Sequence, residues 1–177
     1  VQSILEPIAD DCNWGRTYVD DKKQDVLTYQ LPHKDNVSFE PGGQVEYASR
    51  PYPCLQDATK RLKELQTLFK RKAKEEKIAI VQLGINPWHT VEEVGLQMAK
   101  SRYQAMDRHF TAISEYGRRM MRQTCTVQVN LDFGSDEQTM AMRYLVANML
   151  SPFATLLFAN SPFRDNALSD CNSLRAK

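Results

Sequence analysis

The stretch Ser38–Tyr47, with the sequence SFEPGGQVEY, places two extended segments on either side of a Pro-Gly-Gly break. Pro41 cannot donate a backbone hydrogen bond to a strand ladder, and the glycines permit backbone conformations that other residues avoid. If the strand runs straight after Gly43, the side chains of Gln44 and Glu46 project from one face, because strand side chains alternate with period two. The stretch therefore predicts an extended segment that presents an amide and a carboxylate together.

Regular elements are expected on both sides of this stretch. Two strands, Val26–Leu31 and Val37–Glu40, are separated by proline, aspartate and asparagine and are typical of a hairpin. Residues 1–11 carry apolar side chains at helical spacing, and residues 20–23 are polar and predict a turn. From Cys54 to about Glu76, leucines recur at helical intervals, which predicts a long helix.

The second half of the chain predicts two more strands. Ile78–Gly84 is a continuous, mostly β-branched run and indicates a buried central strand. Thr124–Phe133 alternates, so one face is expected in the core and the other is polar. The expected core residues of that strand are Cys125, Val127, Val129, Leu131 and Phe133.

Helices fill the rest of this half. Between Arg102 and Arg122 we expect two short helices broken near Gly117. Residues 136–158 predict another helix, with a start or kink at Ser151-Pro152. Its expected inward residues are Met140, Tyr144, Leu145, Met149 and Leu150. Antiparallel-type strands with long helices predict an α+β fold, a sheet packed against helices, in a single domain over residues 1–177.

Composition narrows the class of protein. With 177 residues, 42% hydrophobic and 25% charged, the chain fits one soluble folded domain without a run of about 20 apolar residues for a membrane span. A net charge of +1 gives no attraction for nucleic acid. The four cysteines form no CxxC pair, which predicts a reducing cytosol and ordinary buried or half-buried thiols.

Three groups of polar residues could carry chemistry. Glu40 and Glu46 on a rigid strand suit Mg²⁺, which takes carboxylates together with nucleotide phosphates. Gln128 belongs to a polar row on the predicted strand Thr124–Phe133. Three arginines, Arg102, Arg122 and Arg175, offer the bidentate geometry that holds a carboxylate or phosphate. The alternatives stay open: a glycine-rich hairpin with solvated polar residues, a strand with a wet outer face, and routine surface arginines.

Three ordered segments resemble the glutamate-cysteine ligases of plants and many bacteria. Residues 38–46 resemble the pattern S-x-E-P-G-G-Q-x-E, and residues 122–133, RQTCTVQVNLDF, are similar to R-T-C-T-V-Q-V-N-L-D-F. Residues 156–163, LLFANSPF, resemble A-L-F-A-N-S-P-F. The resemblance covers most of the chain from about residue 37 onward.

The resemblance implies a glutamine-synthetase-like fold, in which a curved antiparallel sheet forms a funnel for ATP with Mg²⁺ and for glutamate. The implied reaction transfers the γ-phosphoryl group of ATP to the glutamate γ-carboxylate, and the cysteine amine then attacks the acyl phosphate. By resemblance, Mg²⁺ and ATP would meet Glu40, Glu46 and Gln128. Substrate would be held by Arg102, Tyr103 and Arg175, and Arg122 and Arg175 would serve catalysis.

The sequence departs from the family pattern in three places. The family carries an E-x-E metal-binding strand before the E-P-G-G region, and Asp20-Asp21 is a poor substitute for it. Gln123 stands where the common pattern runs from arginine straight into threonine. The family also continues beyond the last residues, so we expect an internal portion of a catalytic domain that is inactive alone. A ligase for another amine and a non-catalytic binding module remain alternatives.

Overall fold

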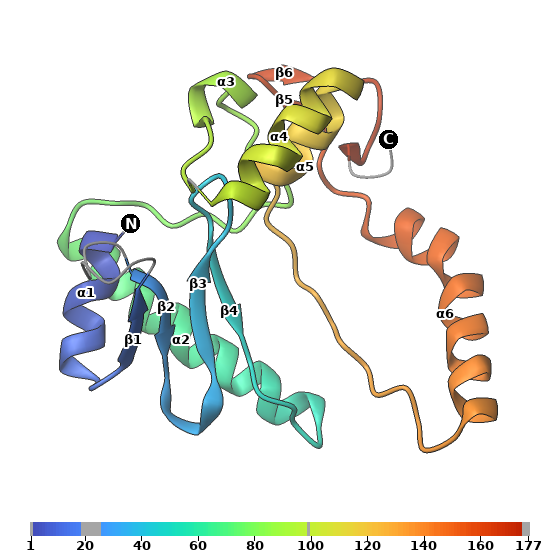
Figure 1. Cartoon of the computed structure of the whole chain (residues 1–177), viewed down its shortest axis with the longest axis horizontal. Coiled ribbons are helices and arrows are strands. Elements are labelled where there is room, and N and C mark those ends of the chain that lie inside the picture. The colour runs from blue at the N-terminus through green and yellow to red at the C-terminus, as the bar shows by residue number, and fades with distance from the viewer. Residues whose placement is uncertain (1, 19–25, 99, 175–177) are drawn as a thin grey trace. The chain divides into compact units, whose positions relative to one another are not determined.

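The computed structural model describes residues 2–18, 26–98 and 100–174 (Figure 1). Its contacts divide the chain into two compact units. The first unit comprises Val1–Gln82 and Leu96–Arg108, and the second comprises Leu83–Gly95 and His109–Lys177. Helices combine with two small antiparallel sheets, which confirms the α+β class. The turn predicted at residues 20–23 lies outside the described residues.

A four-stranded meander forms the sheet of the first unit. The strands are β1 (Gly15–Tyr18), β2 (Val26–Gln30), β3 (Asn36–Phe39) and β4 (Val45–Ala48), paired in the order β1-β2-β3-β4. All three pairings are antiparallel, with Val37 opposite both Tyr29 and Tyr47. A short 3₁₀ turn, η1 (Pro32–Lys34), joins β2 to β3. The predicted hairpin and the predicted extended segment after Gly43 are both confirmed.

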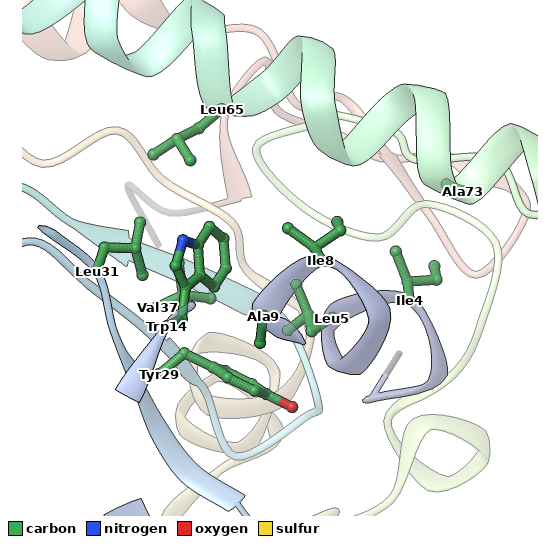
Figure 2. Close-up of a cluster of buried hydrophobic side chains, with 10 residues drawn as sticks. All are labelled: Ile4, Leu5, Ile8, Ala9, Trp14, Tyr29, Leu31, Val37, Leu65 and Ala73. Atoms are coloured by element: carbon green, nitrogen blue, oxygen red, sulfur yellow. The ribbon is translucent and has the colours of Figure 1, made fainter. Parts of the chain in front are cut away.

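Two helices cover the apolar face of this sheet (Figure 2). They are α1 (Gln2–Asp11) and α2 (Leu55–Glu75), both expected from helical spacing. Leu5 and Ile8 of α1 pack in one cluster with Tyr29 and Val37 of the sheet and Leu65 of α2. Phe39 and Tyr47 pack against the edge of this cluster. The sheet therefore has one apolar face under the helices, and its polar residues on β3 and β4 point the other way.

The second unit is built mainly from helices. It contains α3 (Val91–Val94), α5 (Glu115–Gln123), α6 (Glu137–Phe158), β5 (Phe163–Arg164) and β6 (Ala167–Leu168), while α4 (Ser101–Ile113) begins in the first unit. The two helices predicted between Arg102 and Arg122 are confirmed as α4 and α5, but the break between them lies at Ser114, and Gly117 is inside α5. A Cβ on Gly117 would approach Phe110 to 2.6 Å, so this glycine is needed for close packing.

The predictions of strands at Ile78–Gly84 and Thr124–Phe133 are wrong. Neither residues 78–84 nor residues 125–133 form a strand, and Ile80 and Val81 are exposed. Val127 and Leu131 are 84% and 82% exposed instead of lying in a core. A single antiparallel bridge pairs Ile85 with Thr124, and the ladder does not continue from it. An alternating pattern suits a strand, but a strand also needs a neighbour whose backbone groups pair with its own.

Helix α6 is confirmed as a helix, but its predicted inward face is wrong. Met140, Tyr144, Leu145, Met149 and Leu150 are all exposed, and the helix continues through Pro152. By length and composition alone, α6 is the one helix among the described residues that could cross a membrane. Core helices of soluble proteins meet the same criterion, so the absence of a membrane span stays a prediction.

The prediction of buried or half-buried thiols is wrong for three of the four cysteines. Cys12, Cys54 and Cys125 are exposed, and Cys171 is half-buried. Cys54 lies just before the first turn of α2, where its Sγ donates to Asp57 Oδ2 at 3.2 Å.

Candidate active site

A tight turn brings the two candidate carboxylates together. The Gly43 N–H donates to the Glu40 carbonyl at 2.8 Å, and the Glu40 N–H donates to the Gln44 carbonyl at 2.9 Å. Gly43 has φ of 83°, which a residue with a Cβ rarely adopts. The glycine therefore lets β4 return along β3, and Glu46 comes back beside Ser38.

The polar face of the β3–β4 hairpin carries Glu40 and Glu46 as a facing pair. Ser38 Oγ donates to Glu46 Oε2 at 3.4 Å, which places the Glu46 carboxylate on this face. Burial, the Coulombic repulsion of Glu46 and a hydrogen bond with Glu46 raise the pKa of Glu40. Both glutamates are half-buried. Two carboxyl groups are thus held close together at the open side of the sheet, which disfavours the ionisation of both at once.

Two cations lie beside this carboxylate pair. Gln97 donates its backbone N–H to the Pro41 carbonyl at 2.7 Å, which attaches the segment before α4 to the turn. Arg102 and Lys100 follow within five residues, and both oppose the rise in the pKa of Glu40. The Arg102 guanidinium carbon lies 4.6 Å and the Lys100 Nζ 5.6 Å from the ring centre of Tyr103.

Tyr103 organises these two cations. Tyr103 is buried, with 7% exposure, whereas Arg102 is exposed and Lys100 is half-buried. Arg102 Nη2 also donates to Tyr103 Oη at 2.9 Å. The predicted pair Arg102-Tyr103 is therefore brought to Glu40, with the tyrosine as the packed support and the arginine as the accessible charge.

This arrangement fits a hard divalent cation with few protein ligands. Among residues 2–18, 26–98 and 100–174, no group of three or more His, Cys, Asp or Glu side chains could hold a metal ion. Mg²⁺ commonly binds through one or two carboxylates, with water and substrate phosphates completing its octahedron. Glu40 and Glu46 supply two carboxylates, and a cation between them would relieve the repulsion that raises the pKa of Glu40.

A buried polar network holds the other face of the same hairpin. Tyr47 Oη donates to Asp35 Oδ2 at 3.0 Å, and Arg61 Nε donates to the same oxygen at 3.2 Å. The Arg50 backbone N–H donates to Asp35 Oδ1 at 2.9 Å. Asp35 is 1% exposed, so its carboxylate is surrounded by protein groups from α2, from β4 and from the segment just after β4.

The other three predicted site residues belong to the second unit or lie outside the described residues. Arg122 is buried in the second unit, where its Nη1 donates to the Val91 carbonyl at 3.1 Å. Gln128 lies in the exposed, irregular segment after Thr124. Arg175 lies outside the described residues. The roles expected for these three residues stay predictions.

Gln123, which departs from the family pattern, has a structural position. Its side chain is 1% exposed, its Nε2 donates to the His89 carbonyl, and its Oε1 accepts from Arg119 at 3.1 Å. The glutamine therefore ties the end of α5 to the loop before α3.

Residues 9–177 match the family described as Glutamate-cysteine ligase family 2 (GCS2). The chain belongs to this family. It is 31% identical to glutamate–cysteine ligase A, chloroplastic, of Oryza sativa subsp. japonica, and 32% identical to the chloroplastic glutamate–cysteine ligases of Medicago truncatula and Arabidopsis thaliana. Each match covers 99% of this chain and 33–35% of the relative. The chain thus spans about a third of the length of these glutamate–cysteine ligases.

Sequence reasoning did not single out three residues around the site: Lys100, Asp35 and Arg61. Lys100 could have been found, because it precedes Arg102 by two residues and doubles the positive charge at that point. In the sequence, Asp35 lies among turn-forming residues, and Arg61 is one of many charged residues in the helix predicted from Cys54 to about Glu76. Their pairing joins residues 26 positions apart, and no local pattern indicates it.

Proposed function

We propose that this chain carries part of the active site of an ATP- and Mg²⁺-dependent glutamate–cysteine ligase, the enzyme of the first step of glutathione biosynthesis. The observation that supports it most is the Glu40–Glu46 pair, flanked by Lys100 and Arg102, within a member of this family. A site for phosphate and carboxylate groups needs anionic metal ligands beside cations. The β3–β4 hairpin offers the carboxylates, and the start of α4 with the residue before it offers the cations.

The proposed reaction has two steps. An oxygen of the glutamate γ-carboxylate attacks the γ-phosphorus of ATP, so the bond to ADP breaks and an acyl phosphate forms. The cysteine amine then attacks the acyl carbon, inorganic phosphate leaves, and the amine loses a proton. Neither step needs a covalent bond to the protein, because positioning and charge neutralisation supply most of the rate in phosphoryl transfer.

In the proposed site, the acidic residues would bind the metal ion and the basic residues would bind the substrate. Glu40 and Glu46 would hold Mg²⁺, which when bound would neutralise the charge of the ATP phosphates. Arg102, accessible on the packed Tyr103 ring, would hold a carboxylate of glutamate through its two terminal nitrogens. Lys100 would add a compact positive charge beside them. Gln128, Arg122 and Arg175 keep the roles that the family resemblance implies.

We further propose that the four-stranded sheet belongs to a glutamine-synthetase-like funnel. Its antiparallel strands, with helices α1 and α2 on one face and the carboxylates on the other, support this. We also propose that the chain alone is inactive, because the relatives it matches are about three times longer. The cytosol stays our proposal for its location, although these relatives are named chloroplastic.

The test measures ADP release from Mg²⁺-ATP and glutamate, with and without cysteine. It compares this chain with a polypeptide from the same gene that covers the full length of the plant relatives. We expect turnover only in the longer polypeptide, and only with cysteine. Turnover driven by another amine would transfer the proposal to a different carboxylate–amine ligase, and no turnover in either polypeptide would favour a binding module. Activity of this chain alone would contradict its proposed inactivity.

A further inference from the structure

We propose that Asp35 is a positioning residue for the Glu40–Glu46 pair: its buried carboxylate fixes β4 through Tyr47 and Arg50, and so sets where the Glu46 carboxylate stands. This inference rests on the proposed function, because it takes Glu46 as a ligand of Mg²⁺. It concerns the apolar face of the hairpin, where none of the candidate ligands lies.

The Asp35 carboxylate is satisfied on both oxygens. Oδ1 accepts from the Arg50 backbone at 2.9 Å, and Oδ2 accepts from Tyr47 Oη at 3.0 Å and Arg61 Nε at 3.2 Å. These donors come from the segment just after β4, from the strand itself and from α2. One side chain therefore connects the β2–β3 turn to β4 and to the helix that covers the sheet.

Burial makes this connection rigid. A carboxylate with 1% exposure cannot exchange its partners for water, so moving β4 would strand a charge in the protein interior. Burial opposes ionisation of Arg61, yet its hydrogen bond with Asp35 raises the pKa of the guanidinium overall. Burial and the hydrogen bond to Asp35 raise the pKa of Tyr47 well above its ordinary value, so the phenol stays a donor.

The Asp35 network on the apolar face also fixes the side chains on the polar face, because both sets of side chains belong to the same strand, β4. Tyr47 follows Glu46 directly, and consecutive strand side chains point to opposite faces. On the polar face, Glu46 receives a hydrogen bond from Ser38 at 3.4 Å, which is long for such a bond. On the other face, the Asp35 network contributes three shorter hydrogen bonds and therefore fixes β4 more firmly.

A purely structural role predicts a different result from a positioning role, and Tyr29 offers the matched control. Tyr29 is a buried tyrosine of the same sheet, and its Oη donates to Glu6 Oε1 at 2.8 Å. Tyr29→Phe and Tyr47→Phe each remove one hydroxyl that donates to a carboxylate. The two changes differ in place, because only Tyr47 adjoins Glu46.

The experiment measures Mn²⁺ binding by loss of the free-ion EPR signal, together with amide exchange at residues 45–50. It uses the full-length protein and the variants Tyr47→Phe, Asp35→Asn, Tyr29→Phe and Glu46→Gln. We expect Tyr47→Phe to raise the Mn²⁺ dissociation constant about three- to tenfold, less than the 10–100-fold usual for a direct partner of a ligand. Exchange at residues 45–50 should quicken in the same variant, and Tyr29→Phe should change neither quantity.

Each other result counts against the inference. If Glu46→Gln weakens Mn²⁺ binding but Tyr47→Phe and Asp35→Asn bind as the original protein does, the metal site stands and Asp35 does not position it. If Tyr29→Phe weakens binding as much as Tyr47→Phe, the effect is general destabilisation. If Glu46→Gln itself leaves binding unchanged, the metal assignment fails and the inference fails with it. Tyr47→Phe keeps the test decisive should Asp35→Asn not fold.

Discussion

Glu40 and Glu46 face each other across the Pro-Gly-Gly turn with their carboxyls hydrogen-bonded, and repulsion from Glu46 helps to raise the pKa of Glu40. Lys100 and Arg102 oppose this rise, and the pKa of Glu40 is still raised overall. The free protein therefore holds two acidic groups in an arrangement that a bound divalent cation would stabilise. Without a bound cation, the repulsion between the two carboxyl groups lowers the stability of the folded protein.

Glu46→Gln should lower turnover and raise the free energy of unfolding together. The amide keeps the shape of the side chain but is a poor Mg²⁺ ligand, so we expect the activity of the full-length protein to fall by about 100-fold. Loss of the like charge should stabilise the protein by about 0.5 kcal/mol, the usual scale for a partly exposed charge pair. Steady-state ADP release and urea unfolding measure the two effects.

Glu75 provides the control for this change. Glu75 lies at the end of α2 and pairs with Lys72 at 2.8 Å, away from the facing carboxylates. Glu75→Gln should leave turnover unchanged. Full activity in Glu46→Gln would remove Glu46 from the metal site.

Arg102→Leu should raise the KM for glutamate about tenfold while changing kcat less. The reason is that the exposed guanidinium is proposed to bind a carboxylate in the ground state as well as in the transition state, and a charged hydrogen bond contributes about 1.5–3 kcal/mol. Arg108→Leu is the control, because Arg108 is also an exposed arginine of α4. Equal effects of the two changes would show that only the general positive charge of α4 matters.

Gly43→Ala should destabilise the β3–β4 hairpin by about 1 kcal/mol, because the alanine must adopt a positive φ. Its Cβ would also approach Gln97 Cγ to 3.3 Å. Gly84→Ala is the control, since a Cβ there meets Ser161 at an ordinary 3.8 Å. Thermal unfolding of both variants checks this, and an equal Tm for Gly43→Ala and the original protein would contradict it.

Sequence patterns predicted well the elements that pack together in one cluster. The helices at residues 2–11 and 55–75 and the hairpin of β2 and β3 share one cluster, so each apolar pattern has a matching face. Residues 78–84 and 125–133 have equally strong patterns, but neither forms a strand, and their contact is limited to the Cys125 N–H to Gly84 carbonyl bond beside the isolated Ile85–Thr124 bridge. Periodicity reports what a segment could bury and does not reveal whether a partner surface is present.

The site was predictable where its residues lie close together in sequence. Glu40 and Glu46 belong to one motif, and the Pro-Gly-Gly turn makes them neighbours. The approach of Arg102 depends on the hydrogen bond from Gln97 to Pro41, which joins residues far apart in the sequence and leaves no local signal. The Asp35 network is equally hidden, because a buried carboxylate in a turn looks like any polar turn residue until Arg61 is placed over it.

Asp165 lies at the tip of the β5–β6 hairpin. Asp165 and Asn166 have φ of 49° and 61°, as a two-residue turn between strands of this twist requires. Arg119 donates two hydrogen bonds to the Asp165 carboxylate, from Nη1 to Oδ1 at 3.0 Å and from Nη2 to Oδ2 at 2.6 Å. The hydrogen bond from Arg119 holds the pKa of Asp165 below its ordinary value, against a smaller opposing effect of burial.

The sign of the pH dependence follows from that lowered pKa. The ionised carboxylate favours the folded state, so its contribution is complete above the unfolded value near 3.8 and is lost as the pH falls through the lower, folded value. A double-mutant cycle of Asp165→Asn and Arg119→Gln should give a coupling energy of about 2 kcal/mol at pH 7, because the bond is charged and partly buried. Urea unfolding from pH 7 to pH 2.5 should show this coupling energy shrinking only below about pH 4. A coupling energy that is absent at pH 7, or constant down to pH 2.5, would contradict the pairing as the support of this hairpin.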